Sequence, residues 1–289
     1  MGKQPLGYST PSATFRHAET RVTVAGMSRV DELFAKLRGE GRRALMPFLT
    51  AGDPSIETTG RLVRAAVGAG ADLCEIGIPY SDPIADGPVI QASYQRALDG
   101  GFKLDQAMHL GGELSELPSP LVTMASYSII HRIGIDDYLS RAIDAGYAGA
   151  IVPDLLVEEA DRLSKACRER DFSLIQLVTP TTSRERQVRI AESSSGFLYY
   201  VSVTGITGER KTLPPELGDN VAWLREQTEL PICIGFGISG PDVAARLTPV
   251  ADGLIVGSAL VRRVAEAGDD AEQVVKQFVG SLRTAIDSA

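Results

Sequence analysis

Short apolar runs, each followed by a segment with helical patterning, alternate along this chain from Ser28 onward. Apolar runs of this length, bounded by turn residues, are typical of buried parallel strands, and the segments between them repeat with the period of an amphipathic helix. This alternation indicates βα units around a parallel sheet. The predicted strands are 44–50, 71–77, 121–126, 148–153, 173–178, 197–201, 231–236 and 252–256.

Eight such units predict a closed barrel, because eight parallel strands enclose an interior that side chains just fill. We therefore predict an α/β fold, a (β/α)8 TIM barrel with an extra N-terminal helix at 28–42. A helix break is expected at Gly111-Gly112, within the helical stretch 88–117, because glycine weakens helices. Residues 27–289 are predicted to form a single barrel domain. Residues 1–26 are rich in Ser, Thr, Gly and Pro and are predicted to be a disordered extension.

The length of the chain suits a single domain, and its net charge limits the kinds of molecule that it can bind. The 289 residues suit one barrel domain, and the formal net charge of −8 argues against binding to nucleic acid or to an anionic membrane. No apolar stretch approaches the roughly 20 residues that span a bilayer.

Cys74, Cys167 and Cys233 lack metal-type spacing and are predicted to be reduced core residues of a cytoplasmic protein. The three scattered histidines predict no metal site.

Two carboxylates, Glu75 and Asp86, are the candidate catalytic residues. Glu75 lies in an apolar strand, where it shares one face with Leu73 and Gly77, and Asp86 lies in the proline- and glycine-rich loop that follows. Burial of an ionised carboxylate without a partner is costly and raises its pKa, which places proton exchange near neutral pH. Both residues would lie at the C-terminal end of the barrel, where such enzymes carry their sites.

The alternative for Glu75 is a structural salt bridge. The other predicted strands contain no Lys, Arg or His, so a basic partner would have to come from a loop or a helix. The acid/base interpretation gains from this absence.

Glycines after the last two strands predict a phosphate site. Gly237 follows the seventh strand, and Gly257 and Ser258 follow the eighth. Glycine lets backbone N–H groups approach an anion, and barrels often bind phosphate at these two loops, although glycine can also simply end a strand. The loop 204–211 is long enough to act as a lid, but its glycines could equally be turn residues.

The reaction type follows from residues that are missing. No lysine ends a predicted strand, so a Schiff base is not expected. Carbon–carbon chemistry would have to use carboxylate acid/base catalysis with the substrate as its own electron sink, as an indole ring can be.

Several strings closely resemble the tryptophan synthase alpha chain family, and the resemblance covers the chain from about Ser28 onward. They lie at 47–54, 75–91, 205–208, 235–239 and 257–258. The resemblance implies a carbon–carbon lyase of L-tryptophan biosynthesis that cleaves indole-3-glycerol phosphate to indole and glyceraldehyde 3-phosphate by a retro-aldol reaction. It also implies a tryptophan synthase beta chain as partner in an alpha2beta2 tetramer, with pyridoxal phosphate in the beta chain and no cofactor in this one.

The resemblance also implies roles for individual residues. Glu75 would protonate indole C3 and then take the proton of the glycerol hydroxyl, while Asp86 would accept a hydrogen bond from the indole N–H. The phosphate would be held by Gly208, Gly237, Gly257 and Ser258. The indole pocket would be lined by Phe48, Met124, Tyr199 and Phe236, all of which could equally be core residues.

One segment, 124–130, and one single position, Leu156, depart from the family pattern. In the family, the strand-three loop borders the beta chain, so these departures bear on partner contact rather than on the chemistry. Two rival functions stay open, a stand-alone indole-glycerol-phosphate lyase and a catalytically idle regulatory subunit. A sugar-phosphate isomerase is a weaker rival, because it would not explain the string 75–91.

Overall fold

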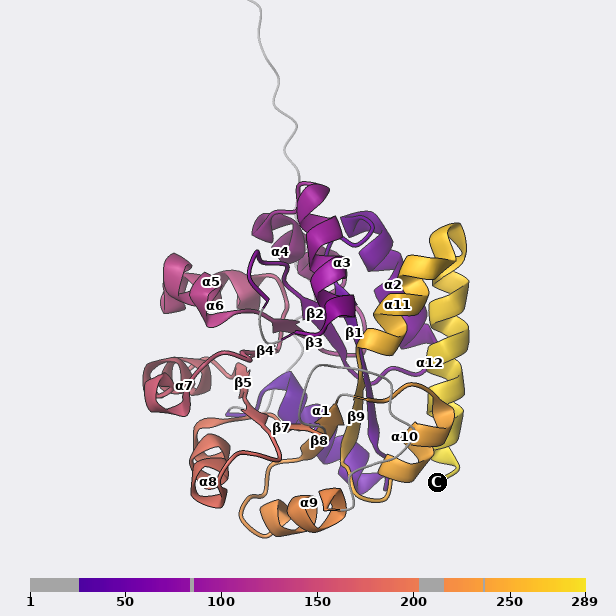
Figure 1. Ribbon diagram of the computed structural model, residues 1–289. Coiled ribbons are helices and arrows are strands. Elements are labelled where there is room, and N and C mark those ends of the chain that lie inside the picture. The colour runs from indigo at the N-terminus through magenta and orange to yellow at the C-terminus, as the bar shows by residue number, and fades with distance from the viewer. Residues whose placement is uncertain (1–25, 84–85, 203–215, 236) are drawn as a thin grey trace, which may run out of the picture.

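A nine-stranded parallel sheet forms the centre of the molecule (Figure 1). The structure is a computed structural model that describes residues 26–83, 86–202, 216–235 and 237–289. The strand order is β5-β4-β3-β2-β1-β9-β8-β7-β6. The strands are β1 Ala44–Thr50, β2 Cys74–Gly77, β3 Leu121–Met124, β4 Gly149–Ile151, β5 Ser173–Ile175, β6 Leu177–Val178, β7 Leu198–Val201, β8 Ile232–Gly235 and β9 Gly253–Val256.

The sheet closes into a barrel through the segment that holds β5 and β6. These two strands are halves of the one predicted strand 173–178, separated by Gln176. The N–H of Val152 donates to the Ile175 carbonyl at 3.2 Å, and the N–H of Tyr199 donates to the Gln176 carbonyl at 3.1 Å. The carbonyl groups of Ile175 and Gln176 therefore accept hydrogen bonds from opposite sides, one from the β4 side and one from the β7 side. The predicted TIM barrel is confirmed, with its fifth strand divided in two.

Helices surround the barrel, as Figure 1 shows. They are α2 Ile56–Gly68, α3 Pro88–Asp99, α4 Leu104–Glu113, α5 Tyr127–Ile133, α6 Ile135–Asp144, α7 Asp161–Arg168, α8 Arg184–Ser193, α9 Leu217–Arg225, α10 Pro241–Leu247, α11 Ser258–Ala267 and α12 Ala271–Asp287, with 3₁₀ turns η1 Val157–Glu159 and η2 Gly268–Asp270. Helix α12 packs against α2, α10 and α11. The short helix α5 was not expected from the sequence.

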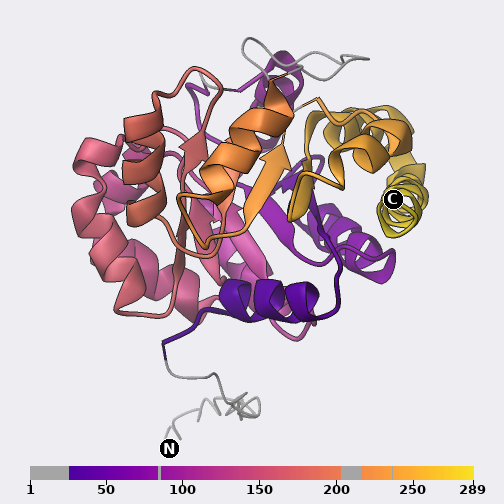
Figure 2. The same ribbon diagram turned by 90° about the horizontal axis from the view of Figure 1, so that it is seen from below.

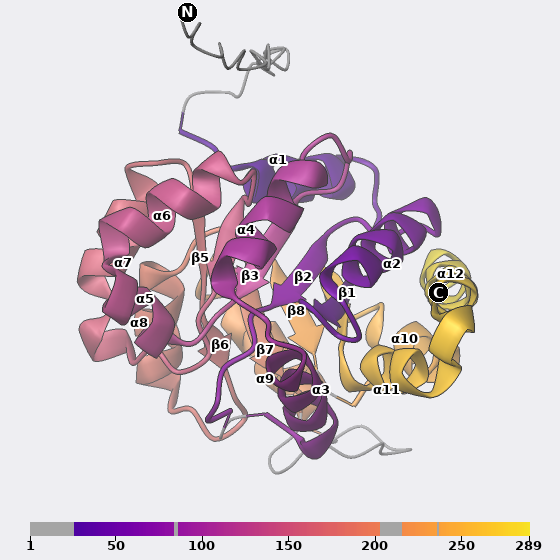
Figure 3. The ribbon, with the colours of Figure 1, turned by 90° about the horizontal axis from the view of Figure 1, so that it is seen from above.

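The predicted extra helix, α1 (Arg29–Gly39), lies across one end of the barrel (Figure 2). Ser28 and Asp31 form a capping box that starts it. The Phe34 ring packs against Phe197 in the barrel, with ring centroids 5.6 Å apart. Figure 3 shows α1 at this end and α3 at the opposite end. Because α1 closes one end, a ligand must enter the barrel from the other.

The helix break in the stretch 88–117 is not at Gly111-Gly112, and that prediction is wrong. Helix α3 ends at Asp99 and α4 begins at Leu104, with Gly101 between them at φ +80°. Helix α4 continues through Gly111. A Cβ atom on Gly111 would lie 2.6 Å from Tyr147 Cε2 and 2.7 Å from the Ala145 carbonyl oxygen. Glycine at this position allows close packing rather than ending the helix.

A pair of alanine substitutions tests this packing role. Gly111→Ala should lower the free energy of unfolding by about 2 kcal/mol, because the new methyl group must displace Tyr147 or the backbone. Gly112→Ala is the matched control: its Cβ would meet nothing within 4 Å, so it should raise the free energy by up to about 1 kcal/mol. Urea denaturation measures both values. Equal effects for the two variants would contradict the packing argument.

Some predictions fall on residues that the structure does not describe. They are most of the predicted extension, residues 1–25, and the predicted lid loop 204–211. Over the ranges that are described, no helix combines the length and apolar character needed to cross a bilayer. The same ranges contain no group of three or more His, Cys, Asp or Glu side chains placed to hold a metal ion.

Candidate active site

Glu75 points into the barrel from β2. It stands level with Phe48 on β1 and Val122 on β3. Cys74 and Ile76 pack in the core between the barrel and its helices, whereas Leu73 packs in the barrel interior with Met46 and Ile255. Since side chains alternate along a strand, Glu75 shares the interior face with Leu73, as predicted.

The Glu75 carboxyl group is fully buried and has no polar partner in the described part of the chain. Its exposed fraction is 0%, and neither Oε1 nor Oε2 accepts a hydrogen bond there. Burial raises its pKa well above the usual range, which favours the protonated acid. The alternative of a structural salt bridge has no support among these residues.

Asp86 lies two residues before the start of α3, and the side chain of Gln91 on that helix holds the backbone of the Asp86 loop. The Gln91 side-chain amide donates to the Asp86 carbonyl at 2.7 Å and to the Pro83 carbonyl at 3.2 Å. Burial raises the pKa of the Asp86 carboxyl to about 6, and the negative charge of Asp154 adds to the rise. At neutral pH Asp86 is therefore mostly ionised, whereas burial favours the protonated form of Glu75.

Polar contacts tie α3 to the end of β1. The hydroxyl groups of Thr50 and Ser93 are 2.7 Å apart. Arg96 donates to both carboxylate oxygens of the buried Asp53, at 2.9 and 2.6 Å. A bidentate contact of this kind is geometrically specific. It holds α3, and hence the loop of Asp86, against the strand next to Glu75.

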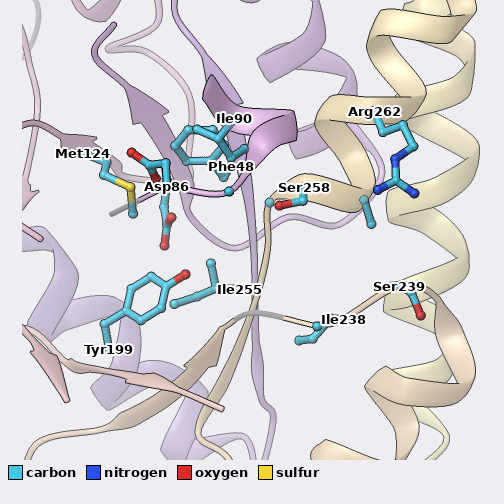
Figure 4. A pocket seen from close by; sticks show the side chains of 15 residues that line it. Phe48, Asp86, Ile90, Met124, Tyr199, Ile238, Ser239, Ile255, Ser258 and Arg262 are labelled. Atoms are coloured by element: carbon cyan, nitrogen blue, oxygen red, sulfur yellow. The ribbon is translucent and has the colours of Figure 1, made fainter. Parts of the chain in front are cut away.

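One pocket at the C-terminal end of the barrel brings the predicted site residues together (Figure 4). Each one that the structure describes lines it, namely Phe48, Glu75, Asp86, Met124, Tyr199, Gly237, Gly257 and Ser258. Gly208 and Phe236 lie outside the described residues. The sequence did not single out the other lining residues as individual site residues; they are Gly87, Ile90, Ile238, Ser239, Ile255, Ala259 and Arg262.

Glycines at two strand ends leave space for the aromatic walls of this pocket. A Cβ on Gly77 would lie 2.3 Å from Phe48 Cζ, and a Cβ on Gly235 would lie 2.3 Å from the Tyr199 hydroxyl oxygen. Any side chain at either position would displace an aromatic ring. The strand-end glycines thus shape the apolar part of the pocket as well as the turns.

The pocket has two chemically different ends. Asp86, Met124 and Tyr199 lie at one end, and Ser239, Ser258 and Arg262 lie at the other (Figure 4). Helix α11 begins at Ser258, and the first N–H groups of a helix have no acceptor within it. This second end suits an anion, and the end with the carboxylates suits proton transfer.

The segment that departs from the family pattern lies beside this pocket. Met124 lines the pocket, and Ser126 caps the unexpected helix α5. Asp154 accepts hydrogen bonds from the Ser126 hydroxyl at 2.6 Å and the Tyr127 N–H at 2.7 Å. Leu156, two residues further on, is 54% exposed. The departures therefore involve a surface next to the site, not the two carboxylates.

The fold and the pocket together define a (β/α)8 barrel protein whose pocket holds two carboxyl groups at one end and the start of α11 at the other. Comparison with known proteins assigns the family: the family model described as Tryptophan synthase alpha chain matches residues 34–288. The tryptophan synthase alpha chain of Rhodopirellula baltica is 66% identical over 278 residues, which are 91% of this chain and 100% of that protein. The alpha chain of a Thermoanaerobacter species is 45% identical over 260 residues, 89% and 99% of the two chains.

Solved structures agree with this assignment. The crystal structure of tryptophan synthase subunit alpha from Legionella pneumophila has a TM-score of 0.85 at 36% identity, covering 91% of this chain and 100% of that one. A Mycobacterium tuberculosis tryptophan synthase structure has a TM-score of 0.83 at 32% identity, covering 90% and 98%. This chain belongs to the tryptophan synthase alpha chain family. It is thus an alpha subunit of tryptophan biosynthesis, with a lyase role.

Proposed function

We propose that this chain cleaves indole-3-glycerol phosphate to indole and glyceraldehyde 3-phosphate. The observation that carries the proposal is the buried Glu75 carboxyl group, which lines a pocket together with Asp86. Among the residues that the structure describes, it has no hydrogen-bond partner. A carboxyl group held without a partner is expensive for the fold and available for proton transfer. The family supports a lyase role, and the geometry of the two carboxylates supports this particular reaction.

The proposed reaction uses Glu75 as both acid and base. Because burial favours its protonated form, Glu75 first gives a proton to indole C3, and positive charge develops on the ring. Ionised Asp86 accepts a hydrogen bond from the indole N–H and offsets this charge. Glu75 then takes the proton of the glycerol hydroxyl, the O–H electrons form the aldehyde, and the electrons of the broken C–C bond return to the ring. Glu75 ends protonated, as it began.

Binding is divided between the two ends of the pocket. Gly208, Gly237, Gly257 and Ser258 would hold the phosphate, where α11 begins. Phe48, Met124, Tyr199 and Phe236 would enclose the indole ring. Such a division places the bond to be broken between the phosphate end and the carboxylates.

The proposed partner is a tryptophan synthase beta chain in an alpha2beta2 tetramer. The family name supports an alpha–beta pair. The beta chain would hold pyridoxal phosphate and consume the indole, and this chain would need no cofactor because the indole ring itself accepts the electrons. We place the activity in the cytoplasm, because all three cysteines are buried and unpaired.

An indole-release assay tests the proposed function. Purified chain should convert indole-3-glycerol phosphate to equal amounts of indole and glyceraldehyde 3-phosphate, and the rate should rise severalfold when the beta chain of the same source is titrated in. High turnover that the beta chain does not change would favour the stand-alone lyase. No turnover under any condition, with a changed rate of the beta chain, would favour the regulatory subunit.

A further inference from the structure

One positively charged side chain lines the pocket, at the end opposite the carboxylates. Of the lining residues that the structure describes, only Arg262 is a Lys, Arg or His. It is half-buried in α11. Figure 4 shows its guanidinium group turned toward the space between Ser258 and Ser239. The carboxyl end of the pocket lies on the other side of that space.

Helix geometry explains why Arg262 reaches the first turn of α11. Ser258 is the first residue of α11, and Arg262 follows four positions later, so the two side chains lie on one face. Helical side chains lean toward the N-terminus of their helix. The long Arg262 side chain therefore extends back along α11 toward Gly257 and Ser258, where the N–H groups are exposed.

The neighbouring Arg263 shows that this orientation is specific. Its guanidinium carbon lies 4.0 Å from the centroid of the Phe278 ring on α12. It also donates to the Ala259 carbonyl at 2.7 Å and to the Ser239 carbonyl at 3.4 Å. Arg263 is therefore engaged between helices and does not line the pocket. Two consecutive arginines face different surroundings, and only Arg262 faces the ligand space.

Charge balance gives Arg262 a function. The proposed substrate carries a phosphate dianion, and the pocket that must accept it also holds the ionised Asp86, with the charge of Asp154 nearby. Backbone N–H groups and a serine hydroxyl supply only partial charges. A guanidinium group supplies a full charge and a planar fork that matches phosphate oxygens.

We propose that Arg262 binds the phosphate group of the substrate and gives the site its preference for phosphorylated over unphosphorylated indole ligands. The proposal rests on the proposed function, because that function defines the ligand. The Ser258 hydroxyl and the N–H groups of α11 orient the phosphate, and Arg262 balances its charge. Arg262 is thus the residue that lets an acidic pocket accept an anionic substrate.

A comparison of two ligands isolates the phosphate contact. The ligands are indole-3-propanol phosphate, which lacks the hydroxyl needed for cleavage, and indole-3-propanol, which lacks the phosphate. Titration calorimetry of the full chain should show that Arg262→Met weakens binding of the phosphate ester about tenfold, the loss of one charged contact at a half-exposed position. Binding of the alcohol should stay within about twofold. Arg262→Lys should restore most of the affinity, because it keeps the charge.

The control removes the same charge elsewhere. Lys276→Met, at an exposed position on α12, should leave the affinities for both ligands unchanged. If Arg262→Met weakens both ligands equally, or leaves the phosphate ester unaffected, the proposal is overturned.

The indole-release assay separates the two proposals. The inference alone fails if the wild-type chain releases indole while Arg262→Met keeps the full affinity for the phosphate ester. The proposed function alone fails if the wild-type chain releases no indole while its affinity for the phosphate ester still depends on Arg262.

Discussion

Glu75→Gln is expected to reduce kcat for cleavage of indole-3-glycerol phosphate by about 10³-fold. The amide has nearly the shape of the carboxyl group but cannot deliver a proton to indole C3 or take one from the glycerol hydroxyl. Substrate binding depends on other residues, so KM should change little. Steady-state indole release with saturating beta chain measures both constants. A variant with unchanged turnover would refute the acid/base role of Glu75.

The stability of the same variant provides a control for folding. Burial raises the Glu75 pKa in the folded state above its value in the unfolded chain. Below the pKa of Glu75 in the unfolded chain, the carboxyl group is protonated in both states and does not destabilise the fold. As the pH rises from there toward the pKa in the folded state, the unfolded chain ionises first and the free energy of unfolding falls. Relative to Glu75→Gln, the wild-type chain should lose about 1.4 kcal/mol for each pH unit in that window. Urea unfolding at a series of pH values, starting from the unfolded-state pKa and rising, measures the difference. A variant less stable throughout would indicate misfolding instead.

The barrel could be predicted from the sequence because a parallel strand buried on both faces leaves a local signal. Each strand is a short apolar run, and each helix repeats with its own period. The division at Gln176 could not be predicted, because it depends on which neighbour each carbonyl bonds. The break near Gly101 was misplaced at Gly111 for a similar reason. Glycine looks the same in a sequence whether it ends a helix or lets Tyr147 pack closely.

Residues of the candidate site could be recognised in the sequence where their chemistry conflicts with the local pattern. Glu75 is a carboxylate where an apolar side chain is expected, and the glycines at 237 and 257 follow strands whose loops meet at one end of the barrel. Arg262 shows no such conflict, because an arginine in an amphipathic helix is ordinary. Its spacing of four residues from Ser258 was the available signal. Ile90 and Ile255 resemble any core residue, so only the three-dimensional arrangement assigns them to the pocket.

Asp86→Asn is expected to lower kcat/KM about 10²-fold, because the neutral amide cannot offset positive charge on the indole ring. The pH profile should change as well. In the wild-type chain Asp86 must be ionised and its pKa is about 6, so kcat/KM should fall below about pH 6. Glu75, which must be protonated, limits activity on the basic side. The Asn variant should lose the acidic limb and keep the basic one.

Substitution of Asp154 tests the role of Asp86 independently, because it leaves the Asp86 side chain itself unchanged. Its negative charge adds to the effect of burial on the Asp86 pKa. Asp154→Asn removes that charge but keeps an oxygen that can accept the Tyr127 N–H. The Asp86 pKa should therefore fall, and the acidic limb of kcat/KM should move to lower pH while the plateau stays within about threefold. If Asp86→Asn retains the acidic limb, or if the limb is unmoved in Asp154→Asn, the titrating group is not Asp86, and the division of roles between the two carboxylates is wrong.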